Sequence, residues 1–138
     1  MIKYELAGDI QQKMNEIIDN TNFWHIKKER VVCIRSRGSA SQGTIARCHA
    51  LTRIWQMALN TKAAYLIEVI SEKFDKLSEE EKTKTIIHEL MHIPKAFGGG
   101  FKHHDFVTSR NVDKIYSVML NNEKRSEDEK NKNFSFWN

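Results

Sequence analysis

The stretch HELMHIPKAFGGGFKHHD, residues 88–105, determines how the rest of the chain is interpreted. It holds two histidines four positions apart, a glutamate directly after the first, a proline, three consecutive glycines and two adjacent histidines. Residues four apart share one face of an α-helix, so His88 and His92 can direct their imidazoles toward one point. Neutral imidazoles are good zinc ligands. The spacing therefore predicts a metal site on a helix.

Glu89 is offset by one position from His88, which places its carboxylate beside the metal rather than on it. There it can accept a proton from a metal-bound water, whose pKa the cation lowers. The pattern predicts His88 and His92 as metal ligands and Glu89 as the general base. A catalytic zinc site usually has three protein ligands and one water. The third ligand is expected to be His103 or His104.

The residues around this stretch predict where its helix begins and ends. Ser78 and Glu81 form a capping box, which places the first helical residue near position 79. Pro94 lacks the amide hydrogen that a continuing helix needs and disfavours helical geometry before it, so the helix should end just after His92. The glycines at 98–100 permit a sharp reversal that can return the chain over the helix end.

The remaining pattern predicts a small α+β domain. Apolar residues recur at helical spacing over residues 5–20 and 106–121, which predicts an N-terminal and a C-terminal helix. Strands are expected in three apolar or β-branched runs, which are RVVCIRSRG, TIARCHAL and AYLIEVIS. TRIWQMALN fits either a short helix or irregular chain. We expect a mixed sheet of about three strands within a single domain over residues 1–121.

Residues 122–138 form a polar stretch that is expected to be flexible. It ends in FSFWN, which could dock on the domain or block its cleft. No segment has the length and apolar character of a membrane span or an export signal, so a cytoplasmic location is expected. Cys33 and Cys48 are then expected to be reduced. His25 and His49 have no motif around them and are expected to be structural or surface residues.

Charge is uneven along the chain. Of the 22 lysines and arginines, seven lie in residues 27–53, against the single acid Glu29. Such a segment can attract phosphates and permits weak nucleic-acid binding, although a solvated basic face has the same composition.

From His88 to His104 the sequence resembles the zincin metallopeptidases, and more narrowly a metallopeptidase family of archaea and phages and the SprT-like group. The family pattern is His-Glu-Leu-x-His-Ile-Pro, then Phe, Gly-Gly and a later His. The resemblance covers roughly residues 45–108 and implies a zincin-like fold, one zinc ion and a peptide or protein substrate. It matches the last ligand to His104, with His103 as the alternative. It also implies that YLIEVISEK lies beside the cleft, where an extended peptide would add to the sheet.

These observations support one main hypothesis and two alternatives. The main hypothesis is a zinc-dependent metallopeptidase in which Glu89 activates a metal-bound water. One alternative is a weakly active or inactive zinc-binding module that regulates or binds nucleic acid through residues 27–53. The other is a structural metal with four protein ligands. For a peptidase, the candidates to stabilise the oxyanion are whichever of His103 and His104 is not a ligand, then Arg110 or Tyr116.

Overall fold

The computed structural model describes the backbone of residues 1–137 and the side chains of residues 1–133. The expected role of FSFWN lies outside the described side chains. The fold is α+β and contains a mixed sheet, as predicted. The sheet has four strands in the order β1-β2-β4-β3, with β2 and β4 parallel and the two outer pairings antiparallel. The strands are β1 (Lys3–Leu6), β2 (Val31–Arg37), β3 (Ala46–Ala50) and β4 (Tyr65–Ile70).

The strand β1 was not predicted. Its residues fall partly in the segment expected to begin the first helix, but Lys3–Leu6 pairs with β2 and the helix starts only at Gly8. Lys3, Tyr4, Glu5 and Leu6 alternate between polar and apolar residues, which is a strand signal, but the run is short and Leu6 also fits the helical spacing of the residues that follow. All four side chains are exposed, so burial on one face does not mark the strand either. Its backbone hydrogen bonds to β2 define it instead.

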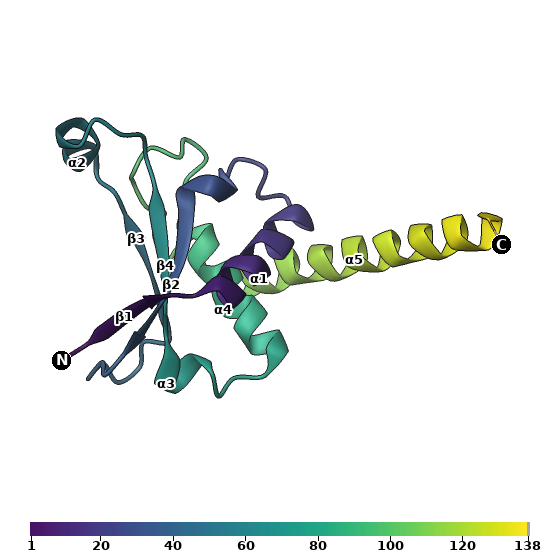
Figure 1. Ribbon diagram of the computed structural model, residues 1–138, viewed down its shortest axis with the longest axis horizontal. Helices are drawn as coiled ribbons and strands as arrows, with labels where there is room; N and C mark the ends of the chain where they lie inside the picture. The colour runs from purple at the N-terminus through teal and green to yellow at the C-terminus, as the bar shows by residue number, and fades with distance from the viewer. Residues whose placement is uncertain (138) are drawn as a thin grey trace.

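The helices α1 and α4 pack on one face of the sheet, and α2 lies beyond its end (Figure 1). The helical elements are α1 (Gly8–Asp19), the 3₁₀ turn η1 (Lys28–Arg30), α2 (Arg53–Ala58), α3 (Ser71–Phe74), α4 (Glu79–Met91) and α5 (Ser109–Trp137). The segment that fitted either a helix or irregular chain therefore forms the short helix α2. Within the described residues, no helix is both long and apolar enough to cross a membrane.

The core lies between the sheet and the helices α1 and α4. Cys33 and Cys48 flank Ile67 on its two neighbouring strands, so the three side chains share the face that meets the helices. Met14 of α1 contacts Cys33, with 3.6 Å between the two sulfurs. Met14 and Ile67 are both fully buried, and each such side chain contributes about 1.5–3 kcal/mol. The two cysteines are free, as predicted.

The helix α4 begins and ends where the sequence predicted. The Ser78 hydroxyl accepts a hydrogen bond from the amide of Glu81 at 3.2 Å, which satisfies one of the free amides of the first turn. The helix continues to Met91, and His92 is its C-terminal cap. Pro94 follows two residues later. These two local signals place the metal-site sequence at the end of a rigid helix.

The last helix is much longer than predicted. It extends from Ser109 to Trp137, well past the expected end at residue 121, and projects away from the domain (Figure 1). The segment 122–133 lacks apolar residues, but it also lacks proline and glycine and is rich in Glu and Lys, which favour helix. Packing against the domain ends close to Asn122, whose side-chain amide donates to the carbonyl of Asn20 at 3.0 Å. The boundary at residue 121 and the flexibility of the tail stay predictions.

Candidate active site

Three histidines meet at the end of α4. His88 and His92 come from the helix and His104 from the loop that follows, and their ligand atoms all lie within 4.8 Å of one another. The ring centroids are 5.2 Å apart for His88 and His92, and 4.7 Å apart for His92 and His104. Three imidazole nitrogens form a donor set that suits zinc. Among the described residues His103 is not part of this group, although it lines the same cavity.

His92 is held in one orientation by the returning loop. Its Nδ1 donates to the carbonyl of Lys102 at 2.7 Å, and the amide of Lys102 donates to the carbonyl of His92 at 2.8 Å. The first bond leaves Nε2 as the free lone pair on the side of the histidine group. The second bond attaches the chain to the helix end two residues before His104. Both bonds therefore favour the three-histidine arrangement.

Tyr65, the first residue of β4, holds the glycine loop. Its hydroxyl accepts from the amide of Gly99 at 2.9 Å and donates to the carbonyl of Gly100 at 2.9 Å. Gly99 has φ +104°, and a side chain there would come within 2.7 Å of the Leu51 carbonyl. Glycine is therefore required at this position. The sequence predicted the glycine reversal but not this contact, because Tyr65 was interpreted only as part of an apolar strand. The available signal was that a buried tyrosine hydroxyl needs a partner.

Replacing Tyr65 by phenylalanine is expected to weaken zinc binding about tenfold, the usual cost of losing a residue that orients a metal ligand. The ring would still pack against Phe97, whose centroid is 5.0 Å away, so the apo protein should unfold at nearly the same temperature. Zinc affinity can be measured by competition with a chromophoric chelator, with Tyr4→Phe on an exposed strand as the control. Unchanged affinity in Tyr65→Phe would show that the loop holds His104 without this hydroxyl.

Glu89 lies beside the histidines in a poorly solvated position. Its side chain is buried, and among the described residues no hydrogen-bond donor acts on the carboxylate. Burial raises the pKa of Glu89 to about 7. Burial, and then the neighbouring His92 and His104, lower the pKa of His88. A neutral imidazole is the form that binds a metal.

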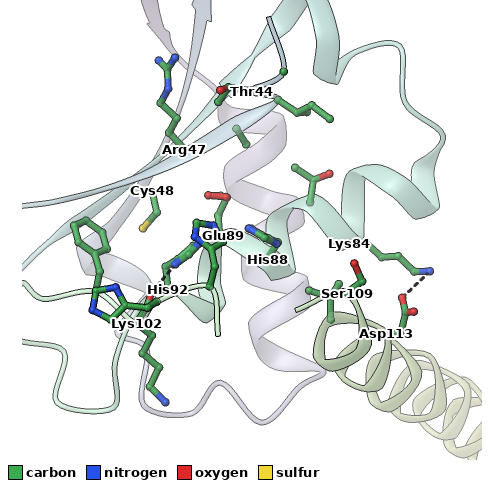
Figure 2. Close-up of a pocket in the computed structure, with 18 residues that line it drawn as sticks. Thr44, Arg47, Cys48, Lys84, His88, Glu89, His92, Lys102, Ser109 and Asp113 are labelled. Carbon is green, nitrogen blue, oxygen red and sulfur yellow. Dashed lines mark hydrogen bonds and ion pairs between the residues drawn. The ribbon is translucent and has the colours of Figure 1, made fainter. Parts of the chain in front are cut away.

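The histidines and Glu89 open into a cleft of about 890 Å³ (Figure 2). The end of α4 forms its floor, and its walls come from β3, the loop 101–104 and the start of α5. Cys48 of β3 lies near Glu89, and burial followed by the Glu89 charge raises the pKa of this thiol to about 12. On the other side, Lys84 of α4 pairs with Asp113 of α5 at 3.1 Å. The helix α4, the edge strand β3 and the helix α5 therefore enclose the site.

The strand beside the cleft is β3, not the predicted YLIEVISEK. That segment forms β4, which pairs with β2 on one side and β3 on the other and so has no free edge. Within residues 1–137, β3 pairs only with β4, and Ala46, Arg47 and Cys48 line the cleft. The prediction was wrong because β3 precedes β4 in sequence but occupies the outer position in the sheet, an arrangement that sequence order does not reveal.

Most of the positively charged side chains in residues 27–53 are paired with acidic side chains in the folded protein. Four of the cations pair with acids: Lys28 with Asp19, Arg35 with Asp9 and Asp75, Arg37 with Glu5, and Arg47 with Glu68. The guanidinium of Arg30 donates to Thr61, Lys62 and Ala63. Of the seven cations, Lys27 and Arg53 form neither an ion pair nor a side-chain hydrogen bond within the described residues. The structure gives no support to nucleic-acid binding through this segment.

The other predicted residues have the following positions. His25 hydrogen bonds with the carbonyl of Ile93 at 3.3 Å, and His49 with Glu68 at 2.8 Å, outside the three-histidine group. Of the oxyanion candidates, His103 lines the cleft, whereas Arg110 and Tyr116 are not among its described lining residues. Tyr116 instead lies under Lys84, with 5.1 Å from its ring centroid to the ammonium nitrogen.

Comparison with known protein families gives a match. The model of a family described as putative phage metallopeptidase matches residues 2–124. No curated protein and no solved structure shows a significant match. The matched segment contains the whole sheet, the three-histidine group and Glu89. Because the match extends over most of the chain, this protein belongs to the phage metallopeptidase family.

Proposed function

We propose that this protein is a zinc-dependent peptidase that cleaves extended segments of polypeptide. The observation that carries the proposal is the convergence of three histidine ligand atoms within 4.8 Å beside a buried carboxyl group. A three-histidine donor set leaves one coordination position open, which is typical of catalytic zinc sites, whereas structural sites use four protein ligands. The open cleft above the histidines supports the same interpretation.

Each residue of the site has a distinct role in this proposal. His88, His92 and His104 would hold the ion, and zinc, when bound, would supply a Lewis acid that acidifies water and polarises the scissile carbonyl. Glu89 would accept the proton of the attacking water and pass it to the leaving amine. A carboxyl group whose pKa lies near neutrality is suited to both transfers. The low polarity around Glu89 would favour transfer of this proton rather than its loss to bulk water.

The edge of β3 supports binding of an extended substrate. Its outer amides and carbonyls have no strand partner within residues 1–137, and an incoming peptide can satisfy them by adding a fifth strand. The pairing would bring a peptide backbone along the cleft wall formed by Ala46, Arg47 and Cys48. Backbone pairing requires an extended chain, so unfolded or flexible protein segments are the proposed substrate class.

The proposal predicts metal-dependent proteolysis. The purified chain loaded with one equivalent of zinc is expected to cleave a reduced and alkylated, fluorescently labelled protein. Chelation should lower the rate at least about a hundredfold, because an activated nucleophile and the charge stabilisation of the transition state are lost together. Adding zinc back should restore the rate. Equal cleavage after complete removal of the metal, or no cleavage of any unfolded substrate by zinc-loaded protein, would contradict it.

A further inference from the structure

A second cavity shares a wall with the active-site cleft. The turn 102–106 contributes to both: His103 and His104 line the cleft, Phe106 lines the second cavity, and Lys102 lines both. The second cavity has a volume of about 390 Å³. Its apolar walls come from the segment after α1, the end of α4 and the side of α5, and consist of Phe23, Trp24, Met91, Ile93, Phe106, Ile115 and Val118.

The charged groups around this cavity are all cations. Lys95, Lys102 and Lys114 line it, together with Asn22 and His25, and no described lining residue is an Asp or Glu. None of the three lysines forms an ion pair with any acid in the described part of the chain. The ammonium nitrogen of Lys102 lies 4.0 Å from the ring centroid of Phe106. The cavity is therefore apolar inside and positively charged at its rim.

Two aromatic residues of the cavity remain in contact with water. Trp24 is 80% exposed and Phe106 is 46% exposed. Exposed apolar groups gathered around a concave surface are characteristic of binding sites. Small-molecule sites commonly have volumes of roughly 300–1,000 Å³, mostly apolar walls and a few polar groups that fix orientation. The second cavity has these properties, and its free cations specify an anionic partner.

We propose that this cavity binds a small amphiphile with an apolar body and a carboxylate, and that the bound ligand stabilises the turn 102–106. The apolar body would pack against Ile93, Phe106 and Ile115, and the carboxylate would reach Lys95 or Lys114. Binding itself does not depend on the proposed peptidase activity. Ordering of this turn is also expected to strengthen zinc binding, because less conformational entropy is then lost when zinc binds. This second effect rests on the proposed role of His104 as a zinc ligand.

Calorimetric titration of the full zinc-loaded chain tests the charge requirement. The three probes are 4-phenylbutyrate, 4-phenyl-1-butanol and 4-phenylbutylamine, which share one apolar body and differ in the charge of the head group. At low ionic strength the carboxylate is expected to bind at least about tenfold more tightly than the alcohol, and the amine least tightly. Equal affinity of the three probes, or no binding of the carboxylate, would overturn the proposal.

Two double variants locate the site. Lys95→Gln/Lys114→Gln is expected to reduce the affinity for 4-phenylbutyrate to that of the alcohol. The matched control, Lys3→Gln/Lys124→Gln, removes two exposed lysines that do not line the cavity and should leave the affinity unchanged. An equal loss of affinity in both variants would show that binding of the carboxylate depends only on the net charge of the protein. This result would overturn the assignment to this cavity.

Two further measurements test the coupling and the source of the carboxylate. Saturating 4-phenylbutyrate is expected to tighten zinc binding about fivefold in the native chain, within the usual range of coupling between sites, but not in Lys95→Gln/Lys114→Gln. An unchanged zinc affinity in the native chain, or equal tightening in both proteins through direct ligation of zinc by the carboxylate, would overturn the coupling even if the peptidase is active. A short peptide with phenylalanine between two aspartates presents the same chemistry on a polypeptide. This peptide is expected to bind more weakly than 4-phenylbutyrate, and tighter binding would overturn the assignment of a small molecule as the ligand.

Discussion

Replacing Glu89 by glutamine is expected to abolish peptide hydrolysis while zinc stays bound. Glutamine preserves the shape of the side chain but cannot accept a proton from water at neutral pH. General acid–base catalysis contributes roughly 10²–10⁴-fold to a rate, so kcat should fall by about that factor. The metal ligands are unchanged, because Glu89 is not part of the group formed by His88, His92 and His104. Zinc content and kcat on an unfolded protein substrate are the two measurements.

Stability provides an independent check that the Glu89→Gln variant is folded. Burial raises the pKa of Glu89 from its ordinary value of 4.5 to about 7, so folding of the apo protein takes up a proton. The resulting stabilisation is fully present below pH 4.5 and is lost as the pH rises through 7. At pH 8 the native chain holds a buried carboxylate that the variant lacks. The apo variant should therefore be more stable there by about 1–3 kcal/mol, and the difference should vanish near pH 4.

The control for this variant lies on the same helix. Glu80 is an exposed residue of the first turn of α4, and its one ion pair among the described residues is with Lys84. Glu80→Gln should therefore retain zinc, activity and nearly all of the stability. A Glu89→Gln protein that binds zinc, is folded and still cleaves the substrate at the native rate would eliminate Glu89 as the base. In that case another group beside the cleft would have to accept the proton.

The parts of the site that depend on neighbouring residues in sequence were predictable. Ser78 and Pro94 set the limits of α4 through backbone hydrogen bonding, and helical spacing put His88 and His92 on one face. Each of these effects acts within a few residues. The sequence alone could therefore place two ligands and the base on a rigid helix before any tertiary contact was known.

The parts that depend on contacts between distant residues were not predictable. The alternation in β1 is short and overlaps the helical pattern of α1, so its pairing with β2 decides the strand. β3 reaches the sheet edge only through the strand order, and Tyr65 contacts a loop more than thirty residues away. The choice between His103 and His104 as the third ligand also depends on contacts between distant residues. Adjacent residues of a loop point in different directions, and the direction of each is set by the bonds between Lys102 and His92 and between Tyr65 and the glycines.

The third ligand can be established by comparing two alanine variants. His104→Ala is expected to weaken zinc binding by more than about a hundredfold, because loss of a direct ligand should exceed the roughly 10–100-fold cost of losing an orienting partner. His103→Ala should bind zinc with nearly native affinity. Both side chains are exposed, so neither change should lower stability by more than about 0.5 kcal/mol. Each variant therefore serves as the folding control for the other.

The pattern of zinc affinities separates the three interpretations of this pair. Loss of zinc only in His104→Ala matches the group found in the structure, in which His104 lies with its ring centroid 4.7 Å from that of His92. Loss only in His103→Ala would require the turn 102–106 to rotate when the metal binds. Loss in both would indicate four protein ligands and a structural site, which would contradict the proposed peptidase.

If His103→Ala keeps its zinc, its kcat then tests whether His103 stabilises the oxyanion. That role predicts a loss of roughly 10²–10³-fold in kcat at unchanged zinc content.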